Sequence, residues 1–189
     1  IKKEIGNKYK GVPILFIEDN KNLKNGTSSA LLNAIENLPD HFLLQYGDTI
    51  LDIDYKDFYN NSQSIKDKML MAIYDNKKNL DKNNIFFKKD KLYYFNSEFS
   101  ENREKIKSAN FIDYGLLGLH KSFLNENLNF LKENESLKNF QQQLSFLDLI
   151  KPYIVKKRFY EIGTPESYEE FKNLFSKGTI KDLIYLKDN

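Results

Sequence analysis

The sequence predicts an α/β fold in which helices pack against a largely parallel β-sheet. Short apolar runs rich in β-branched residues alternate with segments in which apolar residues recur at helical spacing. Near the start of the chain, a strand, a helix and a second strand follow one another, which is the order of a βαβ unit. The 189 residues, 40% of them apolar and 14% aromatic, are enough for one domain with a core.

The βαβ unit lies in the first quarter of the chain. Val12–Glu18 (VPILFIE) is an apolar run with β-branched residues and predicts a buried strand. A turn that ends at Thr27 leads into Ser28–Leu38, where apolar residues follow helical spacing. His41–Tyr46 (HFLLQY) predicts the second strand. We therefore expect two parallel strands joined by a right-handed crossover.

Strands and helices continue to alternate through the rest of the chain. The clearest helix start is Thr164-Pro165, an N-cap followed by proline at the first helical position. We expect helices over Asp54–Asn61, Leu124–Lys132, Leu137–Ile150 and Pro165–Ser176, and strands over Lys68–Tyr74, Asn84–Lys88, Lys91–Asn96, Phe111–Leu119 and Tyr153–Ile162. The last helix is expected to face the core with Tyr168, Phe171, Leu174 and Phe175, and a weakly helical tail runs to Asn189.

Composition and charge exclude several classes of function. The 29 basic and 27 acidic residues are well mixed and give a net charge of +2, so nothing favours nucleic-acid binding. We interpret the abundance of Lys and Asn as a bias of the genome. The chain has no cysteine, which excludes disulfides, zinc–thiolate sites and a thiol nucleophile. Its apolar runs are shorter than the roughly 20 residues of a membrane helix, and no signal-peptide pattern opens it, so we expect a cytoplasmic protein without membrane insertion.

Candidate site residues follow three predicted strands. In open α/β sheets, ligands bind at the carboxyl ends of the strands. These ends carry Gly47-Asp48-Thr49, Asp113-Tyr114-Gly115 and Glu161-Ile162-Gly163-Thr164. Asp48 suits Mg²⁺, which proteins hold through one or two carboxylates together with substrate phosphates. Position alone equally allows Asp48 to cap its own turn, and Glu161 becomes informative only if the fold brings it close to Asp48.

Other polar residues have simpler interpretations. Asp52 and Asp54 form an Asp-x-Asp pair of the kind that binds a metal in glycosyltransferases, but we favour Asp54 as the N-cap of the following helix. His41 and His120 lie in different predicted strands with no catalytic partners around them, so we interpret both as structural and expect His41 to be exposed. The sequence contains neither a GxGxxG nor a Walker A motif.

Four segments carry a resemblance to a known family. Gly26–Asp54 (GTSSALLNAIENLPDHFLLQYGDTILDID) resembles a "GTAGAL … FLVLYGD … DID" pattern, and Met71–Phe95 resembles "TVYRN…D.SNV…DG.V..Y". Phe111–Leu119 (FIDYGLLGL) is similar to "YIDYGL.VL", and Arg158–Phe171 (RFYEIGTPESYEEF) to "RFYEIGTPE.Y.E". In this order, the four segments resemble the bacterial sugar-1-phosphate nucleotidyltransferases, which include heptose and mannose 1-phosphate guanylyltransferases.

The resemblance implies one nucleotidyltransferase domain over residues 1–189. Its fold would be the nucleotide-diphospho-sugar transferase fold, a Rossmann-like mixed, mainly parallel sheet flanked by helices. Its reaction would be the Mg²⁺-dependent transfer of a nucleoside monophosphate from an NTP, with GTP or CTP favoured, to a sugar 1-phosphate. The products would be pyrophosphate and an NDP-sugar for surface polysaccharide. The oligomeric state is left open, a homo-oligomer included.

The resemblance also implies roles for individual residues. Asp48 would be the catalytic residue, because it would hold the Mg²⁺ that bridges the phosphates, with Glu161 as the second metal ligand. The remaining implied contacts are Gly26, Thr27 and Gly47 with the nucleotide, and Tyr114, Gly115 and Glu161 with the sugar.

The chain departs from the family pattern at three places. Many relatives have Asp where this chain has Glu161, and relatives often carry a Lys after the hairpin where this chain reads Tyr94–Ser97. The family's N-terminal strand and glycine-rich phosphate loop would precede Ile1, so we expect the natural protein to begin earlier and this fragment alone to be inactive. Two rival hypotheses are a glycosyltransferase that uses Asp52 and Asp54, and a non-catalytic module that binds a nucleotide sugar.

Overall fold

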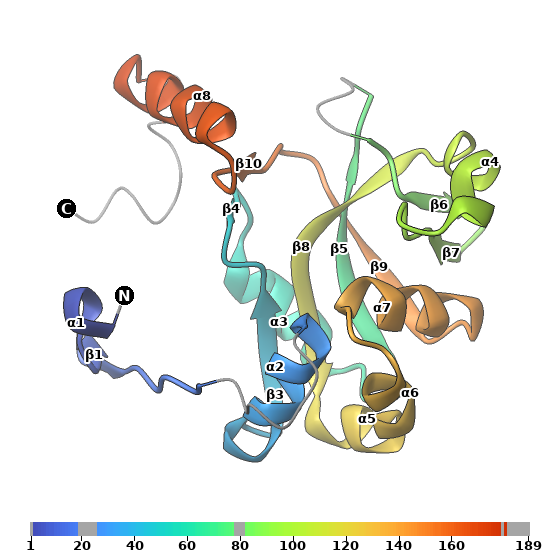
Figure 1. Cartoon of the computed structure of the whole chain (residues 1–189), viewed down its shortest axis with the longest axis horizontal. Coiled ribbons are helices and arrows are strands. Elements are labelled where there is room, and N and C mark those ends of the chain that lie inside the picture. The colour runs from blue at the N-terminus through green and yellow to red at the C-terminus, as the bar shows by residue number, and fades with distance from the viewer. Residues whose placement is uncertain (1, 19–25, 78–81, 179, 181–189) are drawn as a thin grey trace.

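Strand β8 (Phe111–His120) runs through the centre of a six-stranded sheet in the computed structural model, which describes residues 2–18, 26–77, 82–178 and 180 (Figure 1). One edge of β8 pairs with β5, and β5 pairs in turn with β9. The other edge pairs with β3 along its second half and with β6 at Phe111. The remaining bounds are β3 (His41–Gln45), β5 (Met69–Asp75), β6 (Ile85–Lys88), β7 (Lys91–Tyr94) and β9 (Ile150–Val155).

Helices cover both faces of this sheet. On one face the core is built from β5, β8 and a group of four helices, which Figure 1 shows gathered together. On the other face α3 (Tyr55–Gln63) packs on β8 and β3. The residues of β5 alternate between the two layers, as the pleat of a strand requires, with Met69, Met71 and Ile73 on one side and Leu70, Ala72 and Tyr74 on the other. The group of four is α2 (Thr27–Ala34), α5 (Lys121–Glu126), α6 (Leu128–Glu133) and α7 (Leu137–Phe146), with the 3₁₀ turn η1 (Ile35–Asn37) after α2.

Local signals explain where several elements begin and turn. Asp54 caps α3, since its Oδ1 accepts a hydrogen bond from the backbone N of Asp57 at 3.0 Å. The β6–β7 hairpin turns at Lys89 and Asp90, which both have positive φ, as a two-residue hairpin loop requires. Helix α8 (Pro165–Ser176) begins after Thr164, which forms a capping box with Ser167.

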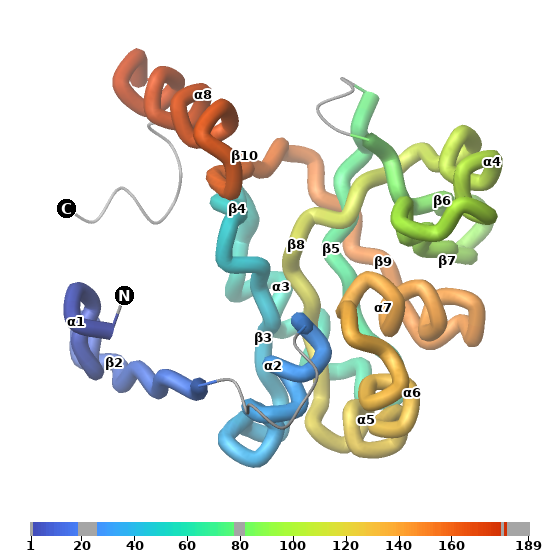
Figure 2. Tube along the Cα trace, in the orientation of Figure 1, coloured from blue at the N-terminus to red at the C-terminus, as the bar shows by residue number. Residues whose placement is uncertain are grey.

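Smaller elements surround the sheet. A two-residue ladder joins β4 (Thr49–Ile50) to β10 (Tyr160–Glu161), although the two are far apart in sequence (Figure 2). Within the described part of the chain, no helix is long and apolar enough to cross a membrane. The other small elements are α1 (Lys2–Ile5), β1 (Lys8–Tyr9), β2 (Val12–Pro13), η2 (Ser100–Asn102) and α4 (Arg103–Ile106).

The α/β class and the mixed sheet flanked by helices are confirmed, but the expectation of mainly parallel pairing is wrong for the described residues. Within the part of the chain that the structure describes, only β5 and β9 pair in parallel, whereas the other ladders of the sheet are antiparallel. The predicted crossover from Val12–Glu18 to β3 is not formed, because Val12–Pro13 pairs only with Lys8–Tyr9 and Leu15 is 67% exposed. A strand is stable only when neighbouring strands accept and donate its backbone hydrogen bonds. Among the described residues, the backbone N of Ile14 still donates to the carbonyl O of Asn7, but no strand lies beside residues 15–18.

Three further expectations need correction near the C-terminus. Helix α7 ends at Phe146 rather than at Ile150, because Asp148 has a φ of 58° and Ile150 already pairs in β9. The strand expected over Tyr153–Ile162 is divided into the end of β9 and the separate β10. None of the residues of α8, all of which are described, is buried, since the helix lies beside the sheet rather than on it (Figure 1). The weakly helical tail after Ile180 lies outside the described residues.

Candidate functional site

The short β4–β10 ladder brings two predicted site residues together. Glu161 pairs with Thr49, and the backbone N of Ile162 donates to the carbonyl O of Asp48 at 2.8 Å. A methyl group placed on Gly163 would lie 3.2 Å from Oδ2 of Asp48 and 3.4 Å from Oε1 of Glu161. Both side chains are exposed. The two carboxylates therefore face the same small, solvent-accessible space.

Two clefts meet beside this carboxylate pair. The larger, here called the apolar cleft, has a volume of about 940 Å³ and lies between α2, β3 and the start of α7. The smaller, here called the polar cleft, has a volume of about 310 Å³ and contains both carboxylates. Of the residues that the structure describes, three line both clefts: Tyr46, Asp48 and Lys138. The polar cleft is otherwise walled mainly by Thr49, Lys82, Asn83, Asn84, Tyr94, Phe95, Asn96, Ser97, Ile112, Asp113, Phe159 and Glu161.

The predicted nucleotide residues Gly26, Thr27 and Gly47 all line the apolar cleft. A Cβ on Gly26 would lie 2.1 Å from the backbone O of Glu135, so only glycine fits this close approach of two chain segments. The hydroxyl of Thr27 accepts a hydrogen bond from the backbone N of Leu137 at 2.8 Å. Both contacts fix the start of α2 against the start of α7 and so shape one wall of the cleft.

A buried carboxylate forms the floor of the polar cleft. The hydroxyl of Tyr46 donates to Oδ2 of Asp113 at 2.8 Å and accepts from Nε2 of Gln141 at 2.8 Å, while the backbone N of Gly115 donates to Oδ1 of Asp113 at 2.9 Å. Burial raises the pKa of Asp113, and these hydrogen bonds oppose the rise. Burial and the nearby Asp113 raise the pKa of Tyr46 well above its usual range. The group is thus a fixed polar network, and its Tyr46 and Asp113 line the polar cleft together with Asp48.

The two predicted sugar residues on β8 have different positions. Gly115 has a φ of 82° at an irregularity in the β5–β8 ladder, and a Cβ there would lie 3.1 Å from Oγ1 of Thr49. Tyr114 is fully buried, and its hydroxyl accepts from the backbone N of Asp52 at 3.1 Å. Its ring packs edge-on against Phe159 at 5.6 Å. Neither residue lines the two clefts as described, so their contact with a sugar stays a prediction.

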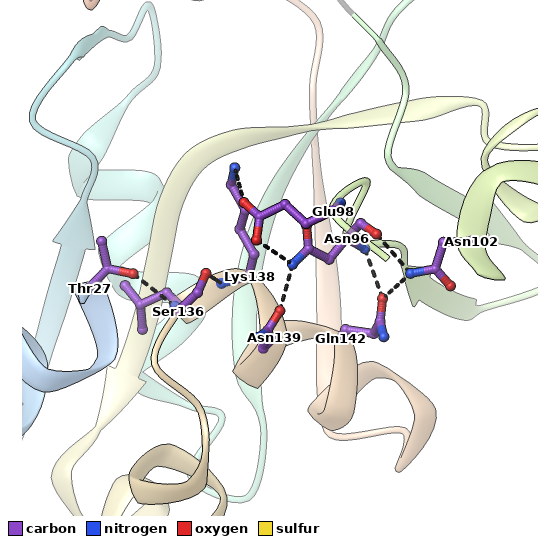
Figure 3. Close-up of polar contacts among 9 residues, drawn as sticks. Thr27, Asn96, Glu98, Asn102, Ser136, Lys138, Asn139 and Gln142 are labelled. Atoms are coloured by element: carbon purple, nitrogen blue, oxygen red, sulfur yellow. Dashed lines mark hydrogen bonds and ion pairs between the residues drawn. The ribbon is translucent and has the colours of Figure 1, made fainter. Parts of the chain in front are cut away.

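A lattice of side-chain amides supports the far wall of the polar cleft, and no pattern in the sequence indicated it (Figure 3). Oε1 of Gln142 accepts from the backbone N of Asn96 at 2.8 Å and from Nδ2 of Asn102 at 2.6 Å. Nδ2 of Asn96 donates to Oδ1 of Asn139 at 2.5 Å. These bonds tie the segment after β7 to α7, across 40 to 46 positions of sequence. The asparagines that we attributed to genome bias have a structural role here.

The carboxylate pair has the chemistry that Mg²⁺ requires. Oxygen ligands from one or two carboxylates, completed by phosphate oxygens and water, are its usual protein shell. Among the described residues, no group of three or more His, Cys, Asp or Glu side chains could hold a metal ion without further ligands. Asp48 and Glu161 therefore fit an ion that arrives with a phosphate, and their metal-binding role stays a proposal.

The competing carboxylates and the histidines are engaged elsewhere. Oδ1 of Asp52 forms an ion pair with Nζ of Lys157 at 2.9 Å, and Asp54 caps α3. The expectation that His41 is exposed is wrong, because it is 9% exposed and its Nε2 lies 2.8 Å from Oγ of Ser62. Its ring lies 4.6 Å from the ring of His120, the residue that faces it across the β3–β8 ladder.

Comparison with known proteins gives a consistent answer for the fold. No family model and no curated protein sequence matches the chain. A crystal structure assigned as a glucose-1-phosphate thymidylyltransferase from Bacillus anthracis, in complex with a sucrose, matches with a TM-score of 0.69 and 13% identity over 92% of this chain and 70% of that one. UDP-glucose pyrophosphorylase complexed with UDP-glucose matches with a TM-score of 0.65 and 14% identity, over 93% and 70%.

A third similar structure is HddC from Yersinia pseudotuberculosis complexed with GMP-PN. It matches with a TM-score of 0.59 and 19% identity, over 92% of this chain and 72% of that one. Two of the three names denote proteins that join a nucleotide to a sugar phosphate. The predicted resemblance is therefore confirmed at the level of architecture: the chain has the fold of the sugar-1-phosphate nucleotidyltransferases.

Proposed function

We propose that this chain provides the metal-binding and sugar-binding part of a sugar-1-phosphate nucleotidyltransferase. The observation that carries the proposal is the meeting of the two clefts at Asp48, where Glu161 faces the same space. An NDP-sugar consists of a flat base, a charged diphosphate and a hydroxyl-rich sugar, in that order. The site offers an apolar cleft, a carboxylate pair and a polar cleft in the same order.

Each part of the ligand has matching surroundings in this arrangement. The base and ribose would occupy the apolar cleft beside Gly26, Thr27 and Gly47. Sugar hydroxyls suit the polar cleft, whose wall includes the amides of Asn83 and Asn84. The carbonyl of Ala109 and the backbone N of Asp113 already hold these two amides in place, and each amide keeps further hydrogen-bonding capacity for a ligand. The fixed network of Asp113 and Tyr46 beneath the cleft would keep this wall in position.

The chemistry needs positioning more than a protein nucleophile. An oxygen of the sugar phosphate forms a bond to the α-phosphorus of the NTP, and the bond from that phosphorus to the pyrophosphate oxygen breaks in line. The attacking phosphate is already largely ionised at neutral pH, so no protein base has to remove a proton. Mg²⁺ held by Asp48 and Glu161 would neutralise the phosphate oxygens. The chain's own contribution is to align the two reactants.

Binding of a finished NDP-sugar tests the proposal directly, because such a ligand needs both clefts. We expect calorimetric titration with UDP-glucose and GDP-mannose to show Mg²⁺-dependent binding that Asp48→Asn weakens at least tenfold, or about 1.4 kcal/mol. Asp52→Asn is the matched control, since its carboxylate is nearby in sequence but paired with Lys157. Loss of binding in Asp52→Asn and not in Asp48→Asn would instead support a glycosyltransferase.

Turnover separates an enzyme from a non-catalytic binding module of the same fold. We expect the full-length protein to release pyrophosphate from an NTP and a sugar 1-phosphate, as a step toward surface polysaccharide. A thermal-shift panel of NTPs with Mg²⁺ would identify the base, because a ligand that binds only the native state raises its stability. GTP or CTP should give the largest shift. Binding without any pyrophosphate release from any pair of substrates would contradict the catalytic part.

A further inference from the structure

Lys138 has a special position between the two clefts. Together with Tyr46 and Asp48, it lines both of them. Among the described residues it is the only cationic side chain on the apolar cleft and the only one shared by the two. In an NDP-sugar the phosphates lie between the base and the sugar. A cation at the junction of the clefts is therefore placed where the phosphates must pass.

The backbone around Lys138 is fixed from two sides. Its own N–H donates to Oγ of Ser136 at 3.1 Å, and the preceding N–H is bonded to Thr27. On the other side, Asn139 and Gln142 of the same helix hold the segment after β7 through Asn96 (Figure 3). The root of the lysine side chain is thus held in place, whereas its side chain is 51% exposed and can reach solvent.

Glu98 is the ion-pair partner of Lys138. Its Oε1 lies 3.5 Å from Nζ, and its side chain is 62% exposed. The backbone N of Glu98 donates to Oδ1 of Asn96 at 3.1 Å, so the amide lattice also fixes the root of this side chain. Exposed ion pairs contribute little net stability, because water and salt screen them. An anion with more than one charge can therefore replace Glu98 at Lys138 without disturbing the fold.

We propose that Lys138 binds the phosphate of the phosphorylated sugar and that Glu98 holds Lys138 at the junction while the clefts are empty. The proposal rests on the proposed function, because it assumes that a sugar phosphate enters the polar cleft. Without Lys138, such a phosphate would face the carboxylates of Asp48 and Glu161 in the polar cleft and that of Glu98 on the apolar side. The cations left to neutralise it would be the metal ion and Lys82 of the polar cleft, so a further positive charge at the junction favours binding. Lys138 supplies this charge from α7, and its release from Glu98 accompanies binding.

Titration of the whole chain with glucose 1-phosphate and mannose 1-phosphate, in the presence of Mg²⁺, tests the role of Lys138. We expect Lys138→Ala and Lys138→Gln to weaken binding of the phosphorylated sugar at least tenfold, which equals about 1.4 kcal/mol. Lys138→Arg should retain most of it. The matched control is Lys107→Ala, because Lys107 pairs with Glu104 at 2.7 Å outside both clefts. Wild-type affinity should also fall more steeply with added salt than that of Lys138→Ala.

Glu98→Gln tests whether Glu98 competes with the ligand for Lys138. A residue with a purely structural role would not be expected to tighten ligand binding when it is changed. Removal of the competing carboxylate should tighten binding of the sugar phosphate about two- to fivefold. It should have no such effect in the Lys138→Ala background. The matched change Glu104→Gln should leave the affinity unchanged. Weaker binding in Glu98→Gln would contradict a carboxylate that competes with the ligand.

Titrations with further ligands show whether a negative result contradicts only the role of Lys138 or the proposed function as well. Free glucose and inorganic phosphate show which half of the ligand Lys138 recognises, and only the sugar 1-phosphates and phosphate should respond to Lys138→Ala. If the wild type binds sugar 1-phosphates and Lys138→Ala binds them within twofold, the inference fails while the proposed function stands. If the wild type binds neither these ligands nor UDP-glucose and GDP-mannose, both are overturned.

Discussion

Gly118, near the end of β8, faces α3 with no room for a side chain. A Cβ at this position would lie 2.3 Å from Cβ and 2.6 Å from Oγ of Ser62, and 3.5 Å from Cε1 of Phe58. Carbon atoms in contact normally lie about 3.5–4.0 Å apart, so Gly118→Ala requires a movement of more than an ångström. Ser62 is 1% exposed and Phe58 is fully buried, which leaves no free space for that movement.

The expected loss of unfolding free energy in Gly118→Ala follows from the cost of overpacking a core. A second change that removes the Ser62 side chain tests whether this clash is the cause. Overpacking of a tight core costs about 1–3 kcal/mol, so we expect Gly118→Ala to lower the free energy of unfolding by about 2 kcal/mol. Ser62→Gly alone should cost about the same, because it removes a hydrogen bond to His41 and places glycine in a helix. The double variant should lose only about 2 kcal/mol, since the Ser62→Gly change removes the side chain that the new methyl group would meet.

Urea unfolding followed by circular dichroism measures these differences. Ser62→Ala is the discriminating control, because it removes Oγ and keeps the Cβ that lies 2.3 Å from the new methyl group. Gly118→Ala with Ser62→Ala should therefore show little compensation. A loss under about 0.5 kcal/mol in Gly118→Ala, or simple additivity of Gly118→Ala and Ser62→Gly, would refute the packing of α3 on β8 described here.

Two further predictions concern the site and pH. Gly163→Ala places a methyl group against the carboxylates of Asp48 and Glu161, which are exposed and can shift slightly, so unfolding should change by less than about 1 kcal/mol. Mg²⁺-dependent binding of UDP-glucose or GDP-mannose should nevertheless weaken about tenfold, and an unchanged affinity would show that no ion uses this space. Burial and the adjacent His120 lower the pKa of His41, so the unfolded chain binds its proton more readily. Stability should therefore fall as pH drops below the unfolded value of 6.5, by at most about 1.4 kcal/mol per pH unit for this one proton, and His41→Asn should flatten the decrease measured by urea unfolding.

The sequence predicted best what is determined by neighbouring residues. Helix α8 begins at Pro165 and ends at Ser176 as expected, because its cap, its proline and its apolar periodicity are all local. The hairpin around Lys89-Asp90 is confirmed for the same reason. A local pattern does not indicate which other helix or strand an element will pack against. The apolar stripe of α8 was real, yet Tyr168 is 51% exposed, since periodicity does not say which surface a helix will meet.

The candidate site was predictable only in pieces. Asp48 and Glu161 could be placed at strand ends from the sequence, whereas their proximity depends on a ladder between segments far apart in the chain. Lys138 and Glu98 carried no signal, because each lies in a polar stretch that is indistinguishable from an ordinary solvated surface. The amide lattice carried no signal for a similar reason, since an abundant residue is explained by composition until its side chains are seen to meet.

The shortness of the β4–β10 ladder matters for how the site is maintained. Two residue pairs fix Glu161 beside Asp48, and a shift of one residue would turn Glu161 to the opposite face of the ladder. The hydrogen bond from Ile162 to the carbonyl of Asp48 extends the ladder by one more contact, and the capping box of α8 begins two residues later. Gly163 lies between the Ile162 hydrogen bond and the capping box at Thr164, which both hold the backbone. Its missing side chain leaves the space beside the two carboxylates open, while the pairing of β4 with β10 stays in place. The geometry of the proposed metal site therefore depends on the start of α8 as much as on the sheet.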